Sequence, residues 1–103
     1  MILVQNIIDS DKRLFTILFD RSVMKHLKCK CNDYLIILQS NFNASHFIIA
    51  KSDTGYKIRR YPKISKTYQS SAMYPFRLLS EFDFIECSYF LKKNNSIRII
   101  LNI

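Results

Sequence analysis

The sequence predicts a β-rich α+β fold with two short helices, because short apolar runs rich in β-branched and aromatic residues recur along it. Apolar residues make up 49% of the 103 residues, which is typical of a chain that packs a core. A chain of this length is near the size of one domain, so we expect a single domain over residues 1–103. The expected strands lie at 2–8, 14–19, 34–38, 47–50, 84–91 and 97–101.

A first helix is predicted at residues 20–28. In the stretch DRSVMKHLK, Asp20 is a residue type that caps helices, because its carboxylate can accept a hydrogen bond from an amide of the first turn. The apolar residues that follow fall on one helical stripe, formed by Val23, Met24 and Leu27.

A second helix is predicted at residues 76–82 in YPFRLLSEF, where Pro75 suits the first helical turn and apolar residues recur every third position. Helix, strand, turn and strand then occur twice along the chain. This order predicts either one unit with an extension or a pseudo-duplicated pair of units, at 9–52 and 66–103, joined by a basic linker at 53–65. A chance similarity of two hairpins remains an open alternative.

The only glycine, Gly55, ends the stretch Asp53-Thr54-Gly55 and predicts a turn in which it supplies a positive φ. The first residues lack the basic start and long apolar stretch of a signal peptide, and no apolar run reaches the roughly 18 residues that span a bilayer. We therefore expect a cytoplasmic protein that does not enter membranes, with its three cysteines reduced.

The stretch HLKCKC places His26, Cys29 and Cys31 within six residues, and three interpretations are open: a metal site, a reactive thiol, or the end of a helix. Structural zinc needs a fourth ligand, which only the folding of a distant residue such as Cys87 or His46 could supply. No orienting Asp or Asn for a Cys-His pair can be identified either. We expect no metal and no cofactor, with Cys29 facing inward and Cys31 more exposed.

The longer run LFTILFDRSVMKHLKCKCNDYLIILQ resembles the core of AbrB- and MazE-type swapped-hairpin domains, and the resemblance extends over residues 14–51. Phe19-Asp20 stands where that family has Ile-Pro, Leu27 where it has its helical leucine, and Asn32-Asp33 where it has Gly-Asp, with Lys30 at the family's lysine. The resemblance implies a β-α-β-β unit that must dimerise to bury its core, and a DNA-binding regulator or antitoxin. Thr16 and Met24 occupy the positions of the family's DNA-contacting arginines.

Within the resemblance, Asn32 suits the left-handed conformation that ends a helix, and Asp33 can accept hydrogen bonds from nearby amides. Cys29 and Cys31 then only fill the helix exit.

The chain carries 16 Lys and Arg against 8 Asp and Glu, a net charge of +8 that favours polyanionic partners, nucleic acid above all. Basic residues and tyrosines alternate in KSDTGYKIRRYPKISKTY, residues 51–68, which suits phosphate contact and stacking on bases. A hairpin strand whose tyrosines pack on a sheet explains this segment equally well. The residues expected to contact nucleic acid are Arg13, Arg21, Lys25, Lys57, Arg59 and Arg60.

No catalytic motif is present in the sequence, so we expect no enzyme. DNA is the expected partner in preference to RNA. The alternative is a structural or protein-interaction module that keeps the fold without binding DNA, because the family arginines are missing and residues 1–8 are expected to form an exposed apolar edge strand, which invites pairing with a protein partner. A homodimer is also kept open.

Overall fold

The computed structural model describes residues 1–8, 13–73 and 81–103, which form nine strands and one short helix. In chain order the elements are β1 (Ile2–Ile8), β2 (Arg13–Asp20), α1 (Arg21–Leu27), β3 (Tyr34–Gln39), β4 (His46–Ser52), β5 (Tyr56–Arg60), β6 (Thr67–Met73), β7 (Phe82–Glu86), β8 (Ser88–Leu91) and β9 (Ile97–Ile100). The β-rich prediction is therefore confirmed, and all of the predicted strands are present in some form.

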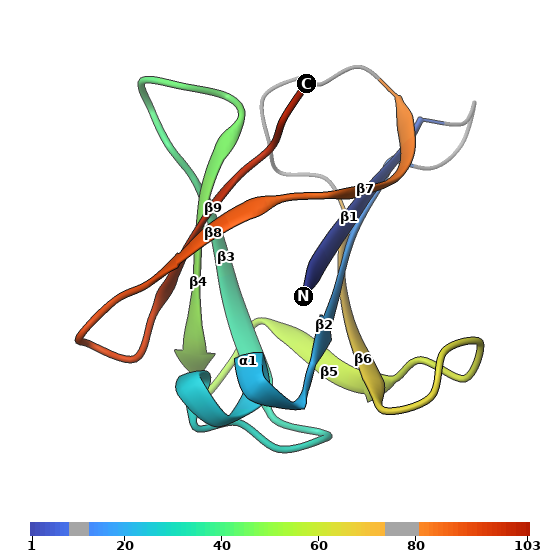
Figure 1. The fold of residues 1–103 in the computed structure, drawn as a ribbon. Coiled ribbons are helices and arrows are strands. Elements are labelled where there is room, and N and C mark those ends of the chain that lie inside the picture. Colours follow the sequence, from blue (N-terminus) through green and yellow to red (C-terminus); the bar gives the residue numbers. More distant parts are fainter. Residues whose placement is uncertain (9–12, 74–80) are drawn as a thin grey trace.

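The nine strands form one antiparallel sheet in the order β7-β1-β2-β6-β5-β3-β4-β9-β8. Strands β7 and β8 stand at opposite ends of this order, yet only Cys87 separates them in the chain. One bent segment therefore pairs with β1 through its first half and with β9 through its second half. This segment closes the sheet almost completely into a barrel (Figure 1).

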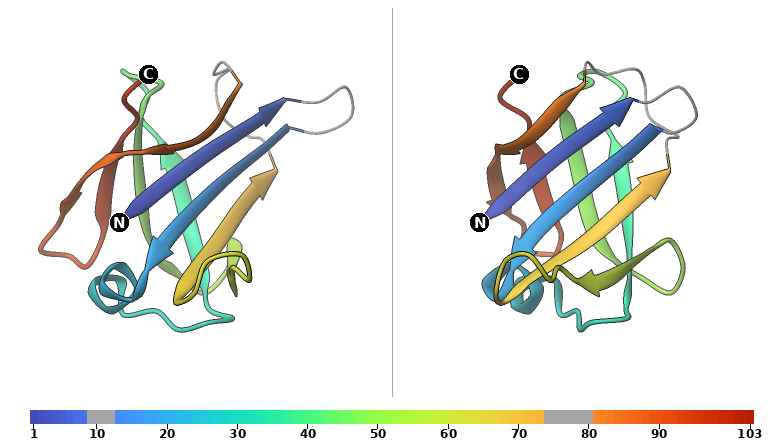
Figure 2. Two further views of the ribbon diagram at one scale, coloured as in Figure 1. Left: turned by 45° about the vertical axis from the view of Figure 1, so that its right-hand side comes forward. Right: turned by 90° about the vertical axis from the view of Figure 1, so that its right-hand side faces the viewer.

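Strand β5 makes the second corner, because it pairs with β6 on one side and with β3 on the other. The barrel thus consists of two facing layers, one with β7, β1, β2 and β6 and the other with β3, β4, β9 and β8 (Figure 2). The rings of Phe15 on β2 and Phe47 on β4 stack between the layers with their centroids 4.7 Å apart. Both are buried, so the core lies between the two layers.

Helix α1 begins where the sequence predicts. The Asp20 carboxylate accepts a hydrogen bond from the Val23 amide at 3.3 Å, and the three predicted apolar residues of the helix are buried. The helix ends at Lys28, which has a left-handed φ of 56°, while the amides of Lys28 and Cys29 bond to the carbonyls of Lys25 and Met24. The helix thus ends at the predicted residue, and Asn32 has the left-handed conformation expected of it, with a φ of 77°, in the turn that follows.

Several predicted boundaries change. Residues 53–65 are more than a linker, because β5 lies within them and closes the barrel by pairing on both sides. The strand predicted at 84–91 is divided at Cys87, where it passes from one layer to the other. The helix predicted at 76–82 lies mostly outside the described residues, and Phe82 belongs to β7.

Strand β1 is not at an edge, since it pairs with β2 on one side and β7 on the other. The exposed apolar edge expected at residues 1–8 is therefore absent from the structure. Alternate residues of β1, among them Ile2 and Val4, are buried in the core instead. The protein-interaction alternative loses this support.

Gly55 has the positive φ predicted for it, at 131°. A Cβ at this position would come to 2.4 Å from the carbonyl oxygen of Leu35, a backbone atom that cannot move aside without disturbing β3. We expect Gly55→Ala to lower the free energy of unfolding by more than about 1 kcal/mol, because both the backbone conformation and the contact oppose a side chain. Chemical denaturation followed by circular dichroism measures it, and Thr54→Ala in the same exposed turn is the control.

Candidate nucleic-acid interface

The connection between β5 and β6, residues 61–66, passes in front of the end of β2 next to α1 (Figure 2). The Tyr61 ring meets the Phe84 ring of β7 edge to face at 6.1 Å, and the Tyr61 amide bonds to the Thr67 carbonyl at 2.8 Å. Leu18 points away from the core because its neighbours Ile17 and Phe19 point inward, yet it is fully buried. The connection is thus fixed against the outer face of the barrel.

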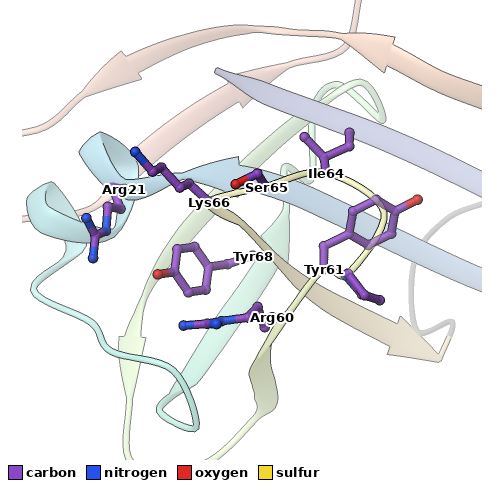
Figure 3. A pocket seen from close by; sticks show the side chains of 8 residues that line it. Arg21, Arg60, Tyr61, Ile64, Ser65, Lys66 and Tyr68 are labelled. Atoms are coloured by element: carbon purple, nitrogen blue, oxygen red, sulfur yellow. The ribbon is translucent and has the colours of Figure 1, made fainter.

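A pocket of about 250 Å³ opens between α1 and this connection (Figure 3). It is lined by Arg21, Arg60, Tyr61, Pro62, Ile64, Ser65, Lys66 and Tyr68. Three cations and two tyrosines therefore surround it, and none of its lining residues carries a negative charge.

Strand register brings these residues together. Arg60 pairs with Tyr68, and Tyr68 pairs with Phe19, so the three side chains follow the core-facing side of their strands. Arg60 follows Ile58, the last buried residue of β5, and is exposed, whereas Tyr68 is half-buried and packs partly against the core. In Figure 3 the Tyr68 hydroxyl and the Arg60 guanidinium point toward the side on which Arg21 stands.

A second, shallower depression of about 370 Å³ adjoins the pocket and shares Arg21 and Tyr68 with it. Its other lining residues include Lys25 and Lys30, together with Cys29 and Cys31. The two depressions form one continuous region, which we call the cationic surface: Arg21, Lys25, Lys30, Arg60 and Lys66, with Tyr68 at its centre.

No cation of this surface lies within 4.0 Å of a carboxylate of the described residues. Two acidic side chains that neighbour these cations in sequence are engaged elsewhere: Asp33 pairs with Lys51 at 3.7 Å, and Asp20 accepts hydrogen bonds from Ser22 and the Val23 amide. Burial alone would raise the pKa of Asp20, but these hydrogen bonds and the Met1 amino group lower it below its usual value. Within the described ranges the positive charges of the surface therefore form no ion pair, and an unpaired cluster of cations favours anionic ligands.

Three of the six residues predicted to contact nucleic acid meet on this surface, namely Arg21, Lys25 and Arg60. Lys57 and Arg59 point to the opposite side of β5, where they line another depression with Gln69 and Ser71. Neighbours in sequence on a strand point to opposite faces, which is why Arg59 and Arg60 separate.

Arg13 lies apart from the others. It begins β2, and α1 follows the opposite end of this strand, about 25 Å away at the usual rise of roughly 3.3 Å per residue. Lys30 and Lys66 also line the cationic surface, although they are not among the residues predicted to contact nucleic acid. Lys66 lines the pocket, and its own backbone is left-handed, with a φ of 55°. Residue 66 is neither a glycine nor an asparagine, the residue types that indicate this conformation in a sequence.

The stretch HLKCKC is divided by the fold. The His26 ring nitrogen Nε2 lies 3.0 Å from the Lys92 carbonyl and 3.2 Å from the Ser96 carbonyl, so it holds the turn between β8 and β9. Cys29 packs partly against the core, whereas Cys31 is exposed, as the sequence predicts. Among residues 1–8, 13–73 and 81–103, no group of three or more His, Cys, Asp or Glu side chains could hold a metal ion.

The three thiols should differ in reactivity. Burial, followed by the negative charge of Asp33, raises the pKa of Cys29 to about 11, and burial with Glu86 does the same for Cys87. Since the thiolate is the reactive form, both should react slowly near pH 8, while the exposed Cys31 should react fast. Labelling with an aromatic disulfide reagent, with mass mapping of the modified peptide, checks this. A fast phase that survives in Cys31→Ser would contradict it.

Comparison with known proteins finds no match to this chain among family models, curated proteins or solved structures. In the part of the chain that the structure describes, no helix has the length and apolar character needed to cross a membrane. Fold and surface therefore define the protein as a small basic chain that closes an antiparallel sheet almost into a barrel, with a cluster of cations at one end.

Proposed function

We propose that this chain is a small, non-enzymatic nucleic-acid-binding protein and that the phosphates of the nucleic acid bind to the cationic surface. The observation that carries the proposal is the convergence of five cations, from α1, its exit turn, β5 and the β5–β6 connection, around two depressions whose lining contains no carboxylate. Phosphate contacts supply most of the affinity of such proteins and need no sequence reading.

Tyr68 adds a feature that a purely electrostatic surface lacks. Its ring is fixed by packing against the core, and it stands between Arg21 and Arg60 at the opening of the pocket (Figure 3). A tyrosine ring beside cations can stack on an unpaired base while the cations hold the neighbouring phosphates. Single strands, or strand ends, are therefore expected to bind at least as well as a duplex.

The resemblance of residues 14–51 to swapped-hairpin domains supports DNA over RNA and a role in transcription regulation or as an antitoxin component. The order of β2, α1, β3 and β4 is the order of that family's unit. We extend the proposal to a swapped-hairpin assembly and a homodimer, which are supported only by this order of elements.

Fluorescence anisotropy at low salt tests the proposal with three labelled probes of equal length: single-stranded DNA, duplex DNA and single-stranded RNA. Binding that weakens steeply as salt rises is the expected result, because bound cations replace condensed counterions. An absence of binding to all three probes at low salt would rule out the proposal.

A further inference from the structure

A second surface of different chemistry lies on the outer face of the layer formed by β3, β4, β9 and β8. Strand register places four side chains in one row across these strands: Leu38 opposite Ile48, Ile48 opposite Arg98, and Arg98 opposite Phe90. Leu38, Ile48 and Phe90 are 55%, 42% and 49% exposed. Three large apolar side chains thus face solvent around a single charged one.

The connection between β3 and β4 extends this row with Phe42, whose side chain is 99% exposed. The turn that carries it is held by hydrogen bonds from the amides of Phe42 and Asn43 to the Ser40 hydroxyl, and from the Gln39 side chain to the Ala44 carbonyl. An aromatic ring is therefore held in water by an ordered turn, at the rim of a depression of about 420 Å³ that Leu38, Ile48 and Arg98 also line.

Arg98 determines what can bind there. Its guanidinium carbon lies 5.2 Å from the centroid of the Phe90 ring, and its Nε atom is buried without a hydrogen-bond partner. The terminal N–H groups of the guanidinium remain for an external partner, since Arg98 forms no ion pair with a carboxylate of the described residues, and a guanidinium stacked on a ring pairs best with a planar carboxylate. Apolar contacts around one unpaired cation therefore fit a ligand that is apolar with an acidic group at its centre.

We propose that this apolar row, comprising Leu38, Phe42, Ile48, Phe90 and Arg98, docks a protein partner through a segment that places one Asp or Glu between apolar side chains. Nucleic acid does not fit, because the row offers a single cation among apolar groups. A second copy of the same row does not fit either, since the residues that line the depression include no acid to meet Arg98. The row shares no residue with the cationic surface, so the proposal is independent of nucleic-acid binding.

A phage-displayed library of random 12-residue peptides, panned on the intact protein, is the probe. Enriched peptides should carry an acidic residue flanked by apolar ones. Synthetic versions should bind on the order of tenfold more weakly to Phe42→Ala and to Arg98→Gln than to the unchanged chain. Leu91→Ala is the matched control, because Leu91 is 57% exposed on β8 and points away from the side that carries Phe90.

Phe42→Ala keeps the test valid if Arg98→Gln unfolds, because the Phe42 ring has almost no contacts to lose. The proposal is overturned if no enriched peptide depends on Phe42, or if the peptides that do depend on it lack an acidic residue. It is also overturned if sedimentation shows a dimer of this chain that Phe42→Ala dissociates, because the occupant would then be a second copy.

Discussion

Replacing Phe15 by alanine should lower the free energy of unfolding by about 3–5 kcal/mol, the usual cost of deleting a buried aromatic ring. Phe15 stacks on Phe47 at 4.7 Å, and each ring comes from a different layer of the barrel. The deletion therefore removes a ring contact between the two layers and leaves a cavity in the core that they share. Because domains of this size have a total stability of only about 5–15 kcal/mol, the variant should lose a large share of it.

The matched control is Phe42→Ala, which removes the same ring from a site that is 99% exposed and should change the stability by less than about 0.5 kcal/mol. Urea unfolding followed by circular dichroism and tyrosine fluorescence measures both variants. Equal losses of stability in the two variants would mean that the layers do not pack through Phe15.

Removing the three cations of the pocket, with Arg21→Gln, Arg60→Gln and Lys66→Gln combined, should weaken nucleic-acid binding roughly ten- to a hundredfold. Each exposed charge contact contributes on the order of 0.5–1 kcal/mol, and 1.4 kcal/mol corresponds to a factor of ten. All three side chains are exposed, so the fold should persist, and thermal unfolding verifies it.

The control removes the same total charge elsewhere. Arg13→Gln, Lys92→Gln and Lys93→Gln together also lower the net charge from +8 to +5, at residues that line neither depression of the cationic surface. Anisotropy should show a much smaller change for this variant. Equal weakening by the two triple variants would mean that net charge alone, and not the cationic surface, determines binding.

The sequence predicts those elements whose own residues carry a strong local signal. Strand β1 has the predicted bounds because five of the seven residues at 2–8 are apolar, and α1 begins after Asp20 because a capping carboxylate precedes an apolar stripe. Gly55 has its positive φ because it is a lone glycine in a polar turn.

Strand β6 escaped prediction because its inward side carries few apolar groups, whereas β5 was anticipated only as the open alternative of a hairpin strand within residues 51–68. In β6, Ser70 is buried beside Ile58, and its hydroxyl is satisfied by the Tyr56 carbonyl at 3.2 Å. In β5 apolar and basic residues alternate, in the order Tyr56, Lys57, Ile58 and Arg59. This alternation is typical of a strand, but the high local charge suggested a linker. Which strands pair is a property of the whole sheet, and no local pattern shows that β5 joins the two layers.

The candidate site was predicted only in part for the same reason. Charge density indicated residues that the fold does bring together, because Arg21, Lys25 and Arg60 meet on the cationic surface. The side on which each residue stands depends on strand phase, and Arg59 was grouped with Arg60 although the two face opposite ways. Lys66 reaches the pocket only through the left-handed turn of the β5–β6 connection.

The salt dependence of binding tests the cationic surface most directly. The affinity for single-stranded DNA is measured over a series of salt concentrations for the unchanged chain and for the Arg21, Arg60 and Lys66 triple variant. Each phosphate contact contributes about 0.7 to the slope of log affinity against log salt for a single strand, so the slope should become shallower by roughly 2 in the variant. Parallel lines for the two proteins would contradict the account, because the three cations would then make no phosphate contacts.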